Sequence, residues 1–230
     1  MVINIDGTDI SSATIDGQEV QEITIDGDTV YTAVSLIDDF EDGNINEYKG
    51  NTNSFSVTTD SYNGTYALEG DSLASIHTNE NDAISLDNYP NSSENYTITY
   101  WYKTDSSTDF PRGGMYFDVD SEGGSYTFSP DSGYVTQIYP SSDVISVSKV
   151  DGDGQSEGLF TADSNTALSN DTWYKGEIIR NTDGYIEFNV YDTSENLLVS
   201  GSTTDNTYSA NGIGFEADAG ICYWDDIKLQ

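Results

Sequence analysis

Short runs of alternating apolar and polar residues, separated by turn residues, constrain the fold of this chain more than any other feature. In residues 185–191, the apolar residues Ile186, Phe188 and Val190 alternate with Glu187 and Asn189, which would face outward. This is the period-two pattern of a half-buried strand. No long window shows the period of about 3.6 residues that marks an amphipathic helix. About a dozen such runs, divided by Gly, Asp, Ser or Pro, predict an all-β antiparallel sandwich or jelly roll.

Two of these runs have patterns that divide inward from outward residues. In residues 96–103, the alternation predicts that Ile98, Tyr100 and Tyr102 face one side and Trp101 the other. In residues 221–229, strict alternation predicts a core face that also includes an acidic residue: Ile221, Tyr223, Asp225, Ile227 and Leu229. A carboxylate on a buried face is costly unless a metal or several hydrogen-bond donors satisfy it.

The first thirty residues contain a threefold repeat built on the sequence Ile-Asp-Gly. Asp-Gly between short apolar runs is a strong hairpin signal, since both residues tolerate positive φ. A two-residue loop fixes the register and places apolar residues opposite one another in each repeat, namely Ile3 with Ile10, Ala13 with Val20, and Ile23 with Val30.

The repeats suggest a division of the chain into two parts. Isolated two-stranded hairpins are marginal in water, so their apolar face must rest on something else. We expect residues 1–34 to form a docking or oligomerisation module and residues 35–230 to form the sandwich. The alternative is that the hairpins only add edge strands to the main sheet.

The charge balance excludes several classes of partner. The chain has 7 Lys and Arg against 41 Asp and Glu, a formal net charge of −34. Such a field repels nucleic acids and anionic membranes. It is typical of a protein that works in molar salt, where the Debye length is about 3 Å and self-repulsion is screened. We therefore expect a halophilic protein.

Cys222 is the only cysteine, so the fold must be stable without an internal disulfide. The first residues contain neither a basic segment nor a long apolar one, and no stretch approaches the roughly 18 apolar residues of a membrane span. We expect the chain to fold in the cytoplasm of the cell that makes it and to reach the outside as part of an assembled particle.

Four motifs, taken together, resemble a known fold family. They are Asp-Phe-Glu-Asp-Gly at 39–43, Ser-Tyr-Asn-Gly-Thr-Tyr-Ala-Leu at 61–68, Asp-Thr-Trp-Tyr-Lys at 171–175, and Tyr-Trp-Asp-Asp-Ile at 223–227. In this order, through residues 36–230, they resemble concanavalin A-like (laminin-G-like) and carbohydrate-binding jelly rolls. The acidic composition and the Ile-Asp-Gly repeats also resemble structural, turret or fibre proteins of haloarchaeal tailed viruses.

The resemblance implies a structural Ca²⁺ ion between the first and last strands. Carried over by position, its ligands would be Asp39, Glu41 and Asp225, with a carbonyl from residues 63–66. Carboxylates and carbonyls are the ligands that Ca²⁺ takes. The alternative is that backbone amides and a Tyr hydroxyl satisfy Asp225 without a metal. Two further acidic stretches, 118–123 and 151–157, lack a full calcium loop and are interpreted as turns.

No catalytic residue is predicted. Glycosidases on this fold need paired carboxylates, but the Glu-x-Asp-x-x-Glu run of laminarinase-type enzymes is absent, and Glu216-Ala-Asp218 lacks its third Glu. The lone histidine, His77, has no cysteine or serine partner in a nucleophilic motif. The sequence therefore favours a protein that is not an enzyme.

Aromatic residues on accessible faces offer a second use of the fold, since flat rings stack on sugars. The candidates are Trp101, Tyr116, Tyr139 and Tyr191, although such rings equally serve as core or as surface cover. Glycosylation sequons occur at Asn63, Asn91, Asn95 and Asn170.

The leading hypothesis is a structural or attachment protein of a halophilic virion, such as a turret, decoration protein or tail fibre. Its partners would be further copies of itself and other virion proteins, through the hairpins, and a host-surface glycan, through the jelly roll. The alternatives are a glycan-active enzyme and a carbohydrate-binding or adhesion module of a halophilic archaeon.

Overall fold

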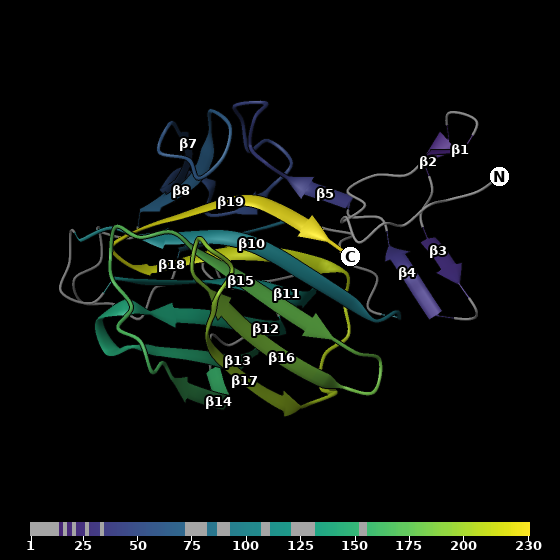
Figure 1. The fold of residues 1–230 in the computed structure, drawn as a ribbon. Coiled ribbons are helices and arrows are strands. Elements are labelled where there is room, and N and C mark those ends of the chain that lie inside the picture. The colour runs from purple at the N-terminus through teal and green to yellow at the C-terminus, as the bar shows by residue number, and fades with distance from the viewer. Residues whose placement is uncertain are drawn as a thin grey trace.

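The computed structural model describes residues 35–71, 93–106, 111–120, 132–151 and 156–230, and in addition the backbone of five short strands at 14–15, 18–19, 22–25, 28–32 and 82–86. In this part of the chain two antiparallel sheets face each other (Figure 1). The predicted all-β antiparallel sandwich is therefore confirmed.

The larger sheet has eight strands. In spatial order they are β17 (Leu197–Thr204), β16 (Tyr185–Tyr191), β15 (Tyr174–Arg180), β10 (Tyr96–Thr104), β19 (Ile221–Leu229), β8 (Ala67–Asp71) and β7 (Phe55–Thr58), and β5 (Ser35–Asp38) also pairs with β19. The first and last strands of the sandwich are therefore direct neighbours, because β5 and β19 are hydrogen-bonded.

The smaller sheet has seven strands. Its order is β14 (Ser156–Asp163), β13 (Val144–Asp151), β12 (Ser132–Tyr139), β11 (Arg112–Asp120), β18 (Gly212–Ala219), β9 (Asp82–Leu86) and β6 (Lys49–Gly50). Two short 3₁₀ turns, η1 (Thr52–Ser54) and η2 (Pro140–Ser142), precede β7 and β13.

The inner faces of both sheets meet in one hydrophobic core. Ile98 and Tyr100 from β10 lie in it with Ile186 and Phe188 from β16, and Phe215 from β18 contributes from the other sheet. The alternation in residues 96–103 and 185–191 thus predicted the inward side of both strands correctly, since burial of one face fixes the parity of a strand.

The inward face of β19 differs from the prediction. Cys222 and Trp224 are fully buried in the core, and so is Ile227. The change of parity occurs at Asp226, whose φ is 55° and where the pairing with β10 shifts register. A bulge of this kind adds one residue to the strand, so the side chains beyond it switch faces. Asp225 is buried as well, but it lies opposite Trp101 on the outer face.

A buried ion pair links the two sheets. Arg180 of β15 donates through Nε to Asp118 Oδ2 of β11 at 2.9 Å, and the Tyr96 hydroxyl donates to Asp118 Oδ1 at 2.6 Å. Asp118 is 1% exposed and Arg180 5%. Asp118 therefore belongs to a strand rather than to the predicted turn at 118–123, and the residues after 120 in that stretch lie outside the described part.

Two of the three predicted N-terminal hairpins lie among the described strands. β1 (Thr14–Ile15) pairs with β2 (Gln18–Glu19), with Ile15 opposite Gln18 as the two-residue loop requires. In the pair of β3 (Glu22–Ile25) and β4 (Asp28–Thr32), a register shift places Ile23 opposite Tyr31 instead of the predicted Val30. The first repeat lies outside the described residues.

Candidate functional site

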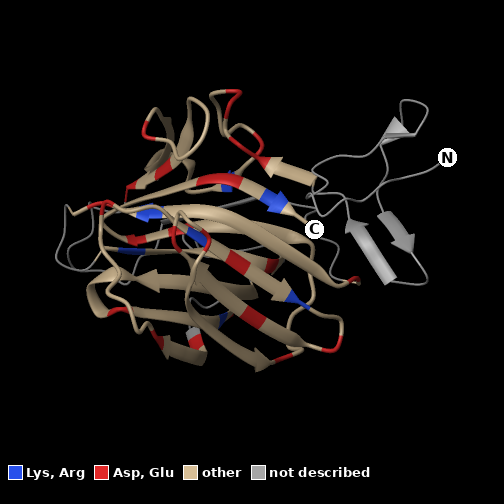
Figure 2. Cartoon of the chain, viewed as in Figure 1, with Lys and Arg blue, Asp and Glu red and all other residues tan. Residues whose placement is uncertain are grey.

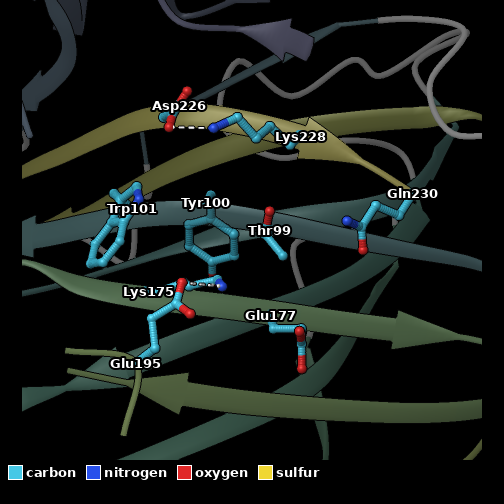
Figure 3. Close-up of a pocket in the computed structure, with 9 residues that line it drawn as sticks. All are labelled: Thr99, Tyr100, Trp101, Lys175, Glu177, Glu195, Asp226, Lys228 and Gln230. Atoms are coloured by element: carbon cyan, nitrogen blue, oxygen red, sulfur yellow. Dashed lines mark hydrogen bonds and ion pairs between the residues drawn. The ribbon is translucent and has the colours of Figure 1, made fainter. Parts of the chain in front are cut away.

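A shallow depression of roughly 220 Å³ lies on the outer face of the larger sheet (Figure 3). Strands β10, β15 and β19 supply most of its lining, and Glu195 in the turn after β16 and Gln230 supply the rest. Its lining is polar apart from two aromatic residues: Thr99, Tyr100, Trp101, Lys175, Glu177, Glu195, Asp226, Lys228 and Gln230.

Strand register explains why these side chains meet. Residues directly opposite one another on antiparallel strands point to the same face. Two adjacent rows therefore cross four strands from β19 to β16. One row is Asp225, Trp101, Lys175 and Tyr191, and the other is Lys228, Thr99, Glu177 and Asn189.

Each charged group in these rows has a defined partner. Lys175 Nζ lies 3.1 Å from Glu195 Oε1, and Lys228 Nζ lies 2.6 Å from Asp226 Oδ2. Glu177 Oε1 accepts hydrogen bonds from the Tyr191 hydroxyl at 2.8 Å and from the side-chain amide of Asn189 at 3.0 Å. Burial, followed by the contact with Glu177, raises the pKa of Tyr191, so this hydroxyl remains a donor at neutral pH.

All seven basic residues of the chain lie on strands, among acidic residues that occur on strands and loops alike (Figure 2). Two of the seven, Lys175 and Lys228, line this one depression. They face three carboxylates, those of Glu177, Glu195 and Asp226. The site thus offers both donors and acceptors, with a negative balance.

A short loop, residues 60–66, covers one end of the first row. Two carboxylates bind its backbone amides from different sides. Asp225 Oδ2 accepts from the amides of Tyr62 and Asn63 at 2.8 and 2.9 Å. Glu41 Oε1 accepts from the amides of Thr65 and Tyr66 at 2.6 and 2.8 Å. The loop is therefore anchored through its main chain.

Gly64 allows Glu41 to approach the loop this closely. Its φ is +66°, a backbone conformation that residues with a side chain rarely adopt, and a Cβ at this position would collide with the carboxylate of Glu41.

The two anchoring carboxylates differ in pKa. Burial raises the pKa of Asp225 to about 6 despite its two amide bonds, whereas the amides of Tyr66 and Thr65 lower the pKa of Glu41.

The predicted calcium ligands lie around this loop. Glu41 and Asp225 are both bound to it by amides, which supply the positive partners that a cation would otherwise supply, and Asp39 Oδ1 accepts from the amide of Glu41 at 3.2 Å. The described residues contain no group of three or more acidic, histidine or cysteine side chains suited to a metal. Asp225 Oδ1 is buried and has no hydrogen-bond partner among the described residues, so this oxygen is the one of the predicted ligand set that is still available to an ion. Calcium binding stays a prediction.

Aromatic rings surround the same loop. The ring of Tyr62 stacks on Trp101 with a centroid distance of 3.6 Å and an interplanar angle of 16°. Lys103 Nζ lies 4.3 Å from the ring centroid of Tyr223 and 2.5 Å from Asp60 Oδ1. This cation beneath the loop adds a second anchor, through Asp60.

The four predicted ligand aromatics divide between the two sheets. Trp101 and Tyr191 share one row of the depression. Tyr116 and Tyr139 lie on the smaller sheet, and Tyr116 is 1% exposed in a cluster of valines, so it offers no open ring face to a sugar. The sequence analysis missed Lys175, Glu177 and Lys228. Alternation shows that these residues point outward from their strands, but it does not show the registers that bring them together.

The outer face of the smaller sheet carries a different polar cluster. Glu216 is 1% exposed, and its Oε1 accepts from Gln137 Nε2 at 3.2 Å. Burial, followed by repulsion from Asp218, raises the pKa of Glu216 to about 7. Asp218 is paired with Arg112. His77 lies outside the described residues.

The predicted sequons differ in their surroundings. Asn63 is exposed in the anchored loop. The side-chain oxygen of Asn95, also exposed, accepts from the amide of Thr182 at 2.9 Å, and that of the half-buried Asn170 accepts from Thr104 Oγ1 at 3.1 Å. Asn91 lies outside the described residues.

No protein-family model matches the sequence, and no curated protein matches it. The fold is similar to that of the carbohydrate-binding module CBM66 from Bacillus subtilis, with a TM-score of 0.56 and 12% identity over 81% of this chain and 97% of that one. It is also similar to a protein of unknown function from Shewanella oneidensis, with a TM-score of 0.52 and 17% identity over 81% and 79% of the two chains.

A third similar structure is the binding domain of botulinum neurotoxin serotype D, with a TM-score of 0.49 and 16% identity over 80% of this chain but only 42% of that one. At these identities the likeness shows the fold alone. The chain therefore has a β-sandwich fold like that of carbohydrate-binding modules. Among the described residues, no helix is long and apolar enough to cross a membrane.

Proposed function

We propose that this protein binds a glycan, without chemical turnover, in the depression on the outer face of β10, β15 and β19. The observation that carries the proposal is the pair of in-register rows, which place a tryptophan beside alternating ammonium and carboxylate groups. Carboxylates accept hydrogen bonds from sugar hydroxyls and lysines donate them, so the charged groups of the two rows suit the hydroxyl groups of a sugar. The fold shared with CBM66 is compatible with this use.

The proposed setting is the surface of a halophilic virion, where the protein would serve as a turret, decoration protein or fibre that attaches to host glycans. The support is the net charge of −34 and the N-terminal hairpins. The hairpins would join copies of the protein or dock it on other virion proteins. Size-exclusion chromatography in molar NaCl, with and without residues 1–34, tests this role, and an unchanged apparent mass would count against oligomerisation through the module.

Glycan binding is tested with an array in molar NaCl and a matched pair of lysine variants. Lys175 and Lys149 have side chains 23% and 22% exposed, and each lies 3.1 Å from a Glu carboxylate. Lys149 is on the smaller sheet. We expect Lys175→Ala to weaken binding of the array ligand about tenfold or more, the cost of losing one hydrogen bond from a charged group, and Lys149→Ala to leave it unchanged. Equal effects of the two variants would refute this site.

A glycan-active enzyme is the second candidate, and Glu216 is the observation that favours it. Its pKa of about 7 lies in the range of a general acid or base, and Asp218 lies two residues along the same strand. Because Glu216 is 1% exposed, it would reach a substrate only if the groups that cover it moved. Incubation with polysaccharides tests this candidate. Turnover that is lost in Glu216→Gln would support it and contradict the non-enzymatic proposal.

A further inference from the structure

The exposed ring of Tyr62 covers the ring of Trp101, which is the larger aromatic surface for a sugar. Trp101 lines the depression, yet its side chain lies under Tyr62 and the residue is only 9% exposed. Tyr62 itself is 36% exposed. A pyranose stacked on Trp101 would need the space that the Tyr62 ring now fills.

The main chain of the covering loop is fixed, but its aromatic side chain projects to the surface. The amide of Tyr62 is bound to Asp225 and that of the next residue to the same oxygen. On the other side of Tyr62, Asp60 is held by Lys103 at 2.5 Å. The Tyr62 ring contacts Trp101 by stacking and Trp173 only at its edge, with centroids 6.0 Å apart. Rotation about the side-chain bonds would uncover Trp101 without breaking any of the anchors.

We propose that Tyr62 is a displaceable cover over Trp101, and that Trp101 is a stacking subsite which extends the depression to accept a second sugar ring. The proposal rests on the glycan-binding function above. In this arrangement, one pyranose replaces the Tyr62 ring on Trp101, and its neighbour hydrogen-bonds to Lys175 and Glu177, which follow in the two rows.

The charges select the class of glycan. The two ammonium groups of the depression are already paired with carboxylates, and a third carboxylate, that of Glu177, accepts hydrogen bonds from two neutral groups. A uronate or sialate would add negative charge to this site. A neutral oligosaccharide of two or more rings, with at least one ring that exposes a C–H face, fits both the carboxylates and the tryptophan.

The test compares cellotetraose, a neutral oligomer whose rings carry C–H groups on both faces, with array ligands in molar NaCl. Stacking of two aromatic rings has a strength that corresponds to roughly two- to tenfold in affinity. We therefore expect Tyr62→Ala to bind cellotetraose roughly two- to tenfold more tightly, or to bind it where the wild type does not. Trp101→Ala should lose this binding, and Tyr62→Phe, which keeps the stacked ring, should match the wild type.

The other outcomes separate the two proposals. Suppose that a glycan binds and that Lys175→Ala lowers its affinity. The depression is then a glycan site, but the cover is refuted if Tyr62→Ala and Trp101→Ala leave the affinity unchanged, and also if Tyr62→Ala lowers it. If neither the wild type nor Tyr62→Ala binds cellotetraose or any array glycan, the proposed function fails and the cover with it. Melting temperatures of all variants in the same salt show whether each one is folded.

Discussion

The outer faces of the two sheets use the same residue types under opposite conditions. On the larger sheet, Lys175, Glu177 and Tyr191 are half-buried and line or border a depression. On the smaller sheet, Tyr116 and Glu216 are each 1% exposed. A tyrosine or carboxylate that remains in contact with water can exchange that contact for a ligand at little cost, whereas a buried one contributes to packing or pays for its desolvation. Exposure, rather than residue type, therefore distinguishes the three residues at the depression from the two buried ones. It does not divide the two faces as wholes, since Asp225 is 1% exposed on the larger sheet and Tyr139 is half-buried on the smaller one.

The two tyrosines give the largest expected difference. Tyr116→Ala removes a fully buried ring, and we expect a loss of about 3–5 kcal/mol in the free energy of unfolding, the range for buried aromatic residues. Tyr191→Ala removes a half-buried ring and should cost less than about 2 kcal/mol, since it loses only part of that burial. Denaturant unfolding in molar NaCl measures both. Equal losses would show that the two faces are not different in packing.

Glu216 predicts a pH dependence of stability. Its pKa is about 7 in the folded chain against the ordinary value of 4.5. The folded state therefore binds the proton of the Glu216 carboxyl more tightly than the unfolded state does. The cost of burying the ionised carboxylate lowers the free energy of unfolding; this cost is absent below about pH 4.5 and reaches its full value, about 3 kcal/mol, above about pH 7. Glu216→Gln keeps the shape without the charge. The difference in unfolding free energy between the variant and the wild type should therefore grow in favour of the variant as pH rises.

The rest of the chain also titrates, so only this difference is informative. It cancels the general repulsion among the acidic residues, which both proteins share. A difference that stays constant from pH 4.5 to 8 would contradict the burial of an ionisable Glu216.

The prediction of calcium binding concerns the covered end of the larger sheet. An ion held by Asp225 would stabilise the folded chain by about 2.7 kcal/mol at a free concentration one hundred times the dissociation constant. We expect the melting temperature to fall on addition of EDTA and to recover with Ca²⁺, and Asp225→Asn to abolish the response. If the melting temperature of the wild type did not change, the ion would be refuted, and Asp225 and Glu41 would bind the loop amides without a metal.

Sequence patterns predicted the strands that have one buried face and failed where the backbone departs from regular alternation. In β10 and β16 the inward residues follow from parity alone. In β19 the positive φ of Asp226 inserts a bulge, and Asp is among the residues that tolerate this conformation, so no apolar pattern marks it. The resemblance to jelly rolls placed Glu41 and Asp225 near residues 63–66, and both bind that segment.

The depression itself could not be predicted, because it depends on registers between strands that are far apart in the sequence. Trp101 meets Lys175 and Asp225 only through the pairing of β10 with β15 and β19. Likewise, nothing in residues 60–66 indicates that Tyr62 stacks on Trp101, because the contact follows from the amide bonds to Asp225. Long-range pairing is what a single sequence leaves open.

The two lysines on the outer faces give the smallest expected difference in stability. Lys175 and Lys149 each form an ion pair with an exposed glutamate at 3.1 Å, one on each sheet. Ion pairs between exposed groups contribute little to stability, and less in high salt, so both alanine variants should unfold at nearly the same denaturant concentration as the wild type. A change in glycan affinity for Lys175→Ala alone, measured on proteins of nearly equal stability, would then come from the lost ammonium group. A stability loss of several kcal/mol in Lys175→Ala would instead mean that this lysine supports the sheet.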